Sequence, residues 1–520
     1  MGKNMNKEIT LTICPNGAAV HPYEPIPPTH TIHCIGKHPQ YSFTADGNGW
    51  REEMLTNINH IATVPDTPTS KLKSSMGNSK ISIPPDGFLK AKQKLYRHDV
   101  LAIGPLYADL KTKSSFDDRK AHCVKKFLER HGKPEVQELI KHLIPHPNDL
   151  NKHYSSLPIK YTSESLQLLV TIDTVFIHEF LLFWSTSYLN YKPMEHDYLF
   201  TSFHNEVECN RVWRDLFLIG NQIPMSFLKK VAEISKMSVE ISNEIPKNHR
   251  FGTNSLKDYL NHIVFINHPF FGSQFHHRST QANWMQTINF LNCNHLLDCL
   301  YVSCTQPPPE PTRQLINPTK ILVRGFQKSK KAEGSKKKYN RLPNASQLLK
   351  AGIRFKACEG NISVIKYNKR KFQLDLPQIV VADNTEDILR NLLAHEQTSK
   401  EGGEFCMYAF IMDSLIDTPD DLAILTKSHV IENLLGSDER LVQMWNDMCR
   451  NLGAQPCQRW EEITRDVMGH YNSHWRILYV EFCAKFFSRP WLWISLVGAF
   501  VLLVFSLVQT IYTVLGYYKA

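Results

Sequence analysis

The sequence predicts a mainly α-helical fold, in which a helical soluble body with a small β-hairpin element is joined to one C-terminal transmembrane helix. Three observations lead to this class. Apolar residues recur at helical spacing through most of the body. Two short segments within residues 362–381 instead alternate with a period of about two, as strands do. The run from Trp491 to Leu515 contains no formally charged side chain.

Composition divides the chain into five predicted segments. Residues 1–90 are rich in Pro, Gly, Asn, Ser and Thr, which predicts a loosely ordered N-terminal extension. Residues 91–305 predict a helical first lobe, and residues 306–341 a Pro-rich and basic linker. Residues 342–487 predict a second lobe that is helical with a small β element, and residues 488–520 the transmembrane anchor and a short tail.

The first lobe opens with an extended segment that ends at a Gly104-Pro105 turn. Helices are then predicted over residues 115–130, 136–143, 163–184, 254–266 and 283–301, and on either side of a break from Gly220 to Pro224. The 163–184 segment is apolar on most faces, but four ionisable side chains interrupt it. We therefore expect it to be the central helix of the core and not a second membrane span.

The second lobe is predicted to begin with a short helix that ends at Gly352. Residues 362–368 and 371–381 form the expected hairpin, joined by a polar turn. Asp383 and Glu386 are expected to cap the next helix. Further helices are predicted over residues 405–416, 420–428, 438–452 and 463–487, the last leading almost continuously into the membrane.

The C-terminal run is the transmembrane candidate. At 1.5 Å per helical residue it is about 37 Å long, enough to cross a hydrocarbon core of about 30 Å. A buried helix of a soluble core is the alternative, but only a few polar side chains (Ser495, Ser506, Gln509, Thr510) interrupt the apolar run. The predicted membrane contacts, with Trp and Tyr rings at the two interfaces, are Trp491, Trp493, Leu496, Phe500, Leu503, Phe505 and Tyr512.

Charges on the two sides of this run predict its orientation. Arg476, Lys485 and Arg489 precede it, whereas only Lys519 follows. Because positive flanks tend to remain in the cytosol, a cytosolic body with a very short tail across the membrane is expected. The N-terminus lacks the apolar core of a signal peptide, which also favours a tail-anchored protein.

The net charge of +10 and the pI near 8.9 suit an anionic partner. Much of the excess lies in the linker, at Lys328, Lys330, Lys331, Lys336, Lys337 and Lys338. A solvated loop is the favoured interpretation, and contact with anionic lipid is the second, at about 1 kcal/mol per Lys near the bilayer. Nucleic acid is disfavoured because few aromatic residues stand among these charges.

The chain has 12 cysteines without a CxxC pair, which favours reduced, mostly buried thiols. A zinc site was considered for one His- and Cys-rich region, whose members are His262, His268, His276, His277, Cys293, His295, Cys299 and Cys304. No pair there has the tight spacing that places two ligands on one turn, so we expect neither a metal nor another cofactor.

No sequence pattern points to catalysis. The chain lacks a GxSxG elbow and a phosphate-binding GxxxxGK[ST] loop. Asp173 with Glu179, or Asp383 with Glu386, are more simply explained as helix-face carboxylates and a cap than as acid and base. We predict that the protein is not an enzyme; a membrane-tethered, hydrolase-like enzyme with a site assembled from dispersed Asp, His and Cys is the alternative.

Several motifs in order carry a family resemblance. They include LYRHDVLAIGPLY, VTIDTVFIHEFL, DLFLIGNQIPMSFL, LPNASQLLKAGIRFKA, ILRNLLAHEQ, MDSLIDTPDDLAIL and HVIENLLGSDERLVQMWNDMC. Together with the Trp-rich anchor they resemble the plant family called domain of unknown function 247, over roughly Ile83 to Tyr518. Two departures stand out: Gly220 replaces a common Glu, and Tyr107-Ala108 replaces a typical Tyr-His pair.

The resemblance implies a plant membrane protein with no known enzymatic activity, located at the plasma membrane. Some grass relatives are regarded as pollen-side determinants of self-incompatibility, which implies a cell-recognition role. The combined expectation is a membrane-anchored interaction or recognition protein with the lipid bilayer and a protein as partners. Neither the partner's identity nor the oligomeric state follows from the sequence.

Overall fold

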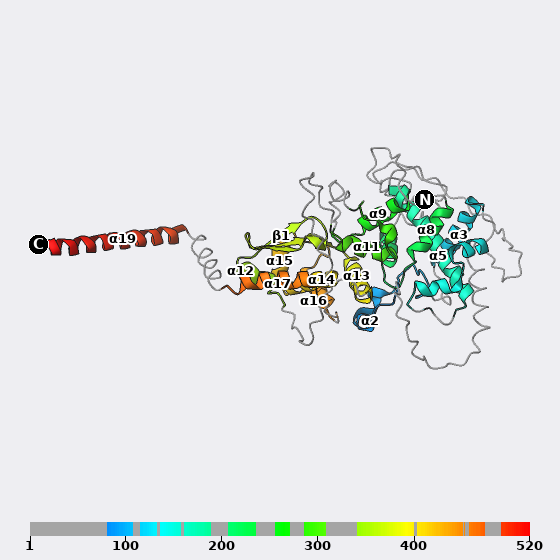
Figure 1. Cartoon of the computed structure of the whole chain (residues 1–520), viewed down its shortest axis with the longest axis horizontal. Coiled ribbons are helices and arrows are strands. Elements are labelled where there is room, and N and C mark those ends of the chain that lie inside the picture. The colour runs from blue at the N-terminus through cyan, green and yellow to red at the C-terminus, as the bar shows by residue number, and fades with distance from the viewer. Residues whose placement is uncertain are drawn as a thin grey trace, which may run out of the picture.

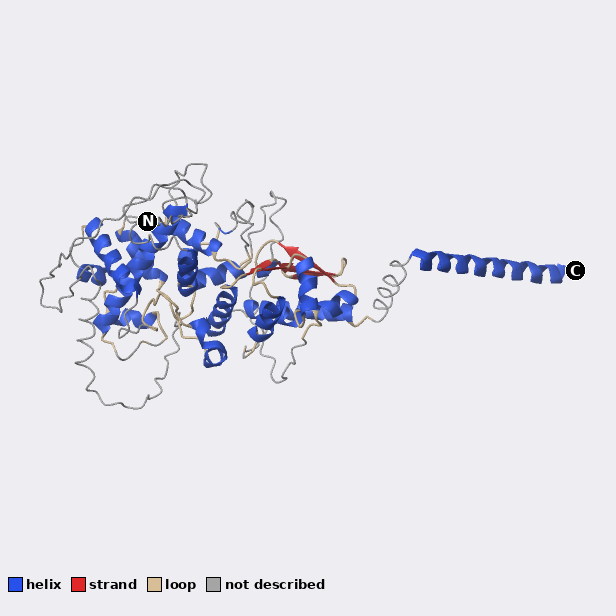
Figure 2. Ribbon diagram, turned by 180° about the vertical axis from the view of Figure 1, so that it is seen from behind, coloured by secondary structure: helices blue, strands red, loops and turns tan. Residues whose placement is uncertain are grey.

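The computed structural model describes residues 81–107, 115–132, 136–155, 157, 161–188, 206–235, 255–270, 285, 287–307, 341–399, 403–450, 452, 457–473 and 490–519. Over these residues the fold is mainly helical with two small sheets, which confirms the predicted class (Figure 2). Residues 1–80 and the six linker lysines lie outside the described parts. The described chain begins at Ile81, whose backbone bonds with the His153–Ser155 segment.

The first lobe is built around α5 (Ser163–Tyr188). Its long apolar stretch, Ser163–Phe183, is 94% buried, which confirms a core helix. The helices packed against it are α3 (Ser115–Arg130), α4 (Val136–Leu143), α8 (Met225–Ile234) and α9 (Leu256–Ile266) (Figure 1). Aromatic rings fill this core: Phe176 meets Phe116 edge to face at 6.3 Å and stacks on Phe180 at 6.2 Å.

Shorter elements complete the first lobe. They are α2 (Asp86–Lys92), η1 (Gln93–Tyr96), η2 (Pro147–Lys152), α7 (Glu206–Leu216), η5 (Phe290–Asn292) and α11 (Leu296–Thr305). The single helix predicted over residues 283–301 is wrong. Extended backbone at His295 separates η5 from α11, because the His295 ring accepts from the Asp298 N–H and caps α11.

The second lobe contains both sheets. After α12 (Ala345–Lys350), strands β1 (Arg354–Cys358), β2 (Lys366–Asn368) and β3 (Gln373–Pro377) pair in the order β1-β3-β2. The antiparallel β2–β3 pair is the predicted hairpin. The predicted strand over residues 371–381 divides into β3 and β4 (Ile379–Val381). Strands β1 and β5 (Ile431–Asn433) were not predicted, nor was their parallel pairing with β3 and β4. Parallel pairing leaves no local turn signal in the sequence.

Helices enclose these sheets. They are η6 (Ile362–Val364), α13 (Thr385–Ser399), α14 (Glu404–Leu415), α15 (Pro419–Lys427), α16 (Asp438–Met448) and α17 (Gln458–Tyr471). Tyr408 of α14 and Trp445 of α16 meet edge to face in the core, 5.9 Å apart. The predicted continuation of α17 toward the membrane falls on residues 474–489, outside the described parts.

Helix α19 (Pro490–Lys519) extends away from the body (Figure 1). It is apolar and long enough to cross a membrane, and its Ile494–Tyr518 stretch is 0% buried within the protein. In α5, by contrast, the apolar surface is buried in the core. An apolar surface of this length without a covering element marks a contact with a membrane or another protein.

Gly220 lies in close contact with the Tyr107 ring. A methyl group at position 220 would lie 2.4 Å from Cε2 of Tyr107. Of the two departures that the sequence showed, Gly220 therefore leaves room for the Tyr107 ring, while Ala108 lies outside the described residues.

This contact predicts how a side chain at position 220 is tolerated. Gly220→Ala is expected to lower the free energy of unfolding by about 1–3 kcal/mol, because the Tyr107 ring must move. Adding Tyr107→Ala should remove most of that penalty, so the two effects will not add. Chemical denaturation of both single variants and the double variant measures the coupling. Strictly additive losses would contradict the contact.

Candidate functional site

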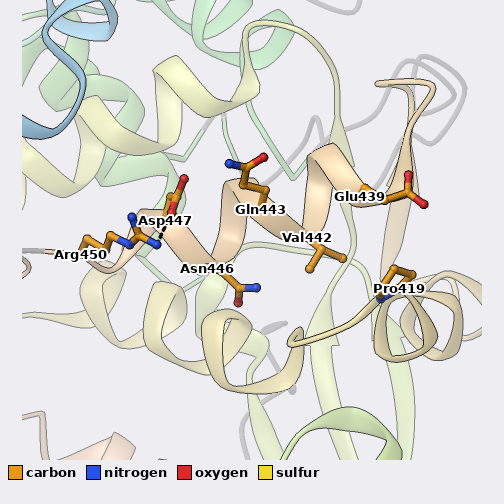
Figure 3. A pocket seen from close by; sticks show the side chains of 7 residues that line it. All are labelled: Pro419, Glu439, Val442, Gln443, Asn446, Asp447 and Arg450. Atoms are coloured by element: carbon orange, nitrogen blue, oxygen red, sulfur yellow. Dashed lines mark ion pairs between the residues drawn. The ribbon is translucent and has the colours of Figure 1, made fainter.

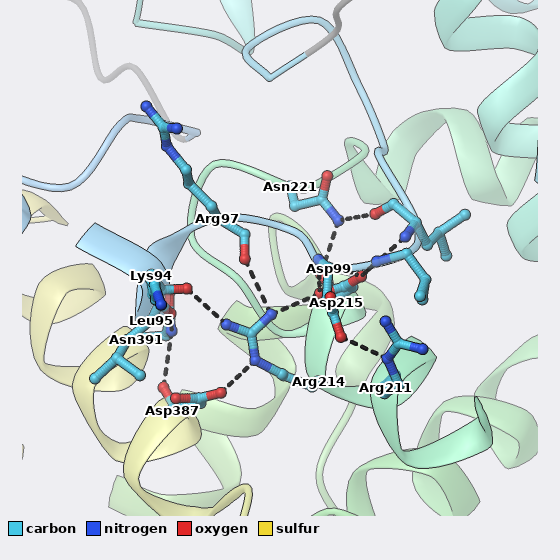
Figure 4. A network of polar contacts seen from close by, with 12 residues as sticks. Lys94, Leu95, Arg97, Asp99, Arg211, Arg214, Asp215, Asn221, Asp387 and Asn391 are labelled. Atoms are coloured by element: carbon cyan, nitrogen blue, oxygen red, sulfur yellow. Dashed lines mark hydrogen bonds and ion pairs between the residues drawn. The ribbon is translucent and has the colours of Figure 1, made fainter. Parts of the chain in front are cut away.

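A network of polar contacts lies where the two lobes meet, around Arg214 of α7 (Figure 4). Its guanidinium forms an ion pair with Asp387 of α13 and another with Asp215, at 2.8 Å. It also donates to the backbone carbonyl of Lys94 at 2.8 Å and of Arg97 at 3.0 Å. Arg214 thus joins three parts of the chain that are far apart in sequence.

Asp215 holds the extended segment from Arg97 to Ile103 in place. Its carboxylate is fully buried and accepts hydrogen bonds from the backbone N–H groups of Asp99 (2.9 Å), Val100 (2.8 Å) and Leu101 (2.9 Å). Burial raises the pKa of Asp215, while these bonds and Arg214 act in the opposite direction. Such a carboxylate serves as an internal anchor point for backbone and is closed to solvent.

Two amides extend the network. Asn221 accepts from the Ile103 N–H at 2.6 Å and donates to the carbonyls of Leu101 and Asp215. Asn391 of α13 accepts from the Ile219 N–H at 3.0 Å and donates to the Leu95 carbonyl at 3.1 Å. The segment from η1 to Gly104 is thereby fixed to both lobes.

The acids of α5 are occupied in the same way. Asp173 forms a buried ion pair with Lys120 at 2.6 Å and accepts from the Gly104 N–H at 2.8 Å. Glu179 pairs with Arg130 at 2.6 Å and contacts His178. Each carboxylate therefore has its own partners, as expected for structural helix-face acids.

We expect the contribution of these acids to the free energy of unfolding to depend on their burial as well as on their charge. Asp215→Asn is expected to lower the free energy of unfolding by about 3 kcal/mol or more, because three N–H groups and Arg214 lose a buried anion. Asp99→Asn is the matched control: Asp99 also pairs with an arginine, Arg211, but both are about half exposed, so a loss below about 1 kcal/mol is expected. Equal losses in denaturant titrations would contradict this account.

The His- and Cys-rich region contains a buried Cys–His contact. Cys304 Sγ lies 3.6 Å from Nε2 of His268. Burial lowers the pKa of His268 to about 3, opposed in part by a backbone hydrogen bond to Ser303, and burial raises the pKa of Cys304. Both groups are neutral at pH 7, so this pair lacks the thiolate that a cysteine nucleophile needs.

Neighbouring acids in this region also have structural partners. Asp298 accepts from the Asn294 N–H and contacts His395 at 3.2 Å. Although burial opposes it, contact with His395 and His295 holds the pKa of Asp298 at about 2. Glu396 accepts from the Tyr301 hydroxyl and from two N–H groups at the start of α14.

Across the described residues no group of three His, Cys, Asp or Glu side chains is placed to hold a metal ion. His276 and His277, which belong to the considered cluster, lie outside those residues. His262 and His295 are buried, and the ring of His295 caps α11.

His268 makes the stability of the fold depend on pH, and the low pKa of the folded histidine fixes the sign of that dependence. An unfolded histidine takes up a proton below about pH 6.5, whereas folded His268 stays neutral to about pH 3. It therefore removes stability as the pH falls through this window, by about 1.4 kcal/mol per unit. His268→Gln should show a shallower loss between pH 6.5 and 4.5, by about 2–3 kcal/mol in total, measured by denaturation in detergent. His142→Gln, at an exposed position, is the control, and identical slopes for His268→Gln and the parent would refute the assignment.

A shallow open groove of about 400 Å³ follows the outer side of α16 (Figure 3). Most of the surface that faces the groove is apolar. The lining residues are Pro419, Glu439, Val442, Gln443, Asn446, Asp447 and Arg450. Arg450 and Asp447 form an ion pair at 3.0 Å. An open groove of this kind is suited to contact with another macromolecule more than to enclosing a small substrate.

Comparison with known proteins identifies the family. A family model described as plant protein of unknown function, the domain of unknown function 247, matches residues 81–505. The chain belongs to this family. It is similar to two UPF0481 proteins of Arabidopsis thaliana: one is 22% identical over 420 residues, covering 68% of this chain and 74% of the relative. The other is 21% identical over 440 residues, covering 83% and 86%. No solved structure matches.

In this family member the predicted site residues have different outcomes. Leu496, Phe500, Leu503, Phe505 and Tyr512 are all exposed along α19. Trp491 and Trp493 belong to that helix, but their side chains lie outside the described parts, as do Lys328, Lys330, Lys331, Lys336, Lys337 and Lys338. Lipid contact by these residues stays a prediction.

Sequence reasoning missed the junction of Arg214, Asp215 and Asn391. One signal was present, since an adjacent Arg-Asp pair interrupts the apolar run VWRDLFLIG. A charged pair in such a run predicts burial with partners. Their partners are more than 100 positions away, so the sequence could not name them.

Proposed function

We propose that this chain is a membrane-anchored interaction or recognition protein whose body does no chemistry of its own. The observation that carries the proposal is α19, which is apolar, long enough to span a bilayer and not covered by the body. Anchoring would confine the body to a surface and raise its effective concentration toward partners in the same membrane.

The polar groups of the body support an interaction role. The buried acids at the lobe junction and in α5 each bond to backbone or to a basic side chain, so they are committed to the fold. Cys304 and His268, which contact each other, are both neutral and buried. The groove along α16 is open and mostly apolar, with charged side chains such as Glu439 and Arg450 in its lining, and it is our candidate contact face for a protein partner.

We place the body in the cytosol. Three basic residues precede α19 and only Lys519 follows the apolar stretch. The eight cysteines whose side chains are described are free thiols, as a reducing compartment favours. Location at the plasma membrane and a role in self-incompatibility rest on the family resemblance alone.

Topology is tested in microsomes with the full chain carrying a glycosylation tag after Ala520. Glycosylation of the tag together with protease digestion of the body is the expected result. Glycosylation of Asn344 would report the opposite orientation. Asn344, in an Asn-Ala-Ser sequon, is suitable as a reporter because it is only half-buried. Asn361 is a poor reporter because its amide is buried and donates to the carbonyls of Ser303 and Gln306. A protected body glycosylated at Asn344, with an unmodified tag, would contradict the proposed orientation.

A further inference from the structure

Small and polar residues gather on one face of α19. Between Ile494 and Gly516 the helix contains eight Ser, Thr, Gln, Gly or Ala residues, namely Ser495, Gly498, Ala499, Ser506, Gln509, Thr510, Thr513 and Gly516. At 3.6 residues per turn all eight fall within an arc of about 120°. Within this stretch, Leu502 is the one large apolar residue in the arc, and Leu, Val, Ile, Phe and Tyr cover the rest.

Some of these polar side chains form hydrogen bonds within the helix, whereas the amide of Gln509 does not. Thr510 and Thr513 donate to the carbonyls of Ser506 and Gln509, each at 2.8 Å. The side-chain amide of Gln509 makes no hydrogen bond to any described residue. An amide near the middle of a bilayer without a partner is costly, so a partner outside this helix is favoured.

The glycines point to the same face. A Cβ at Gly498 or Gly516 would meet nothing within 4 Å, so no contact in this chain requires a glycine there. In membranes small residues let two helices approach closely, and polar side chains bond between them. The series Ser495, Ala499, Leu502, Ser506, Gln509, Thr513, Gly516 also alternates in steps of four and three, the spacing of a left-handed helix pair.

We propose that α19 pairs in the bilayer with α19 of a second copy of this chain, parallel and along this face. A second copy is favoured because the Gln509 amide is both donor and acceptor. A parallel two-fold axis sets Gln509 opposite its counterpart, where the two amides satisfy each other. This inference rests on the proposed function, since it requires α19 to span the membrane.

The test uses the full chain with donor and acceptor fluorescent proteins at the N-terminus, reconstituted in phosphatidylcholine vesicles. Energy transfer above the level of random proximity, falling as lipid dilutes the protein, is expected. Gln509→Leu should weaken association about 3- to 20-fold. The double variant Gln509→Leu/Ile511→Gln keeps one glutamine in the helix but moves the amide to the opposite face, and it should also be weak. Val504→Leu, on the opposite face, is the control and should associate as the parent does.

Glycosylation of the C-terminal tag in microsomes is read for each variant, so that insertion and pairing are judged separately. An unmodified tag together with an unmodified Asn344 would contradict the membrane-spanning function itself. A modified tag with transfer only at the random level in vesicles would overturn the second-copy proposal and leave another protein's span as the partner of this face. Strong transfer unchanged by Gln509→Leu would also overturn it, since pairing would then run through the body or another face.

Discussion

The buried carboxylate of Asp215 is the constraint on which the body depends. It gathers three consecutive backbone N–H groups of an extended segment, and the adjacent Arg214 reaches the carboxylate of Asp387 in the second lobe. Extended backbone without a neighbouring strand needs other partners for its polar groups. Here Asp215, Asn221 and Asn391 supply them, so one short segment connects the two helical lobes.

This arrangement explains how so many ionisable side chains can be buried in the body. A buried charge is tolerated when it is paired and hydrogen-bonded. Asp173 with Lys120, and Glu179 with Arg130, meet that condition inside the first lobe. Both carboxylates therefore stabilise the fold through these ion pairs. Among the described residues, the groove along α16 and the apolar surface of α19 are exposed, and both are suited to contact with other molecules.

Much of the helical fold could be predicted because amphipathic spacing is a local signal. Residues 115–130 form a helix with the predicted bounds, and Pro224 ends the break before α8 as expected. The failures are non-local. β1 and the β4–β5 pair depend on parallel partners, and Glu386, expected to cap α13, instead binds Lys92 at 2.6 Å and Arg390 at 2.8 Å. The contacts between the lobes could not be predicted for the same reason. The long apolar helix α19 was predictable because its signal is one continuous run of sequence.

The central claim is that α19 alone holds an independently folded body on the membrane. Flotation on a density gradient after an alkaline carbonate wash tests it, with the full chain compared with a chain that ends at Ser488. The account predicts that the full chain floats with the vesicles, while the shortened chain remains soluble and unfolds cooperatively. Release of the full chain by carbonate, or flotation of the shortened chain, would contradict it.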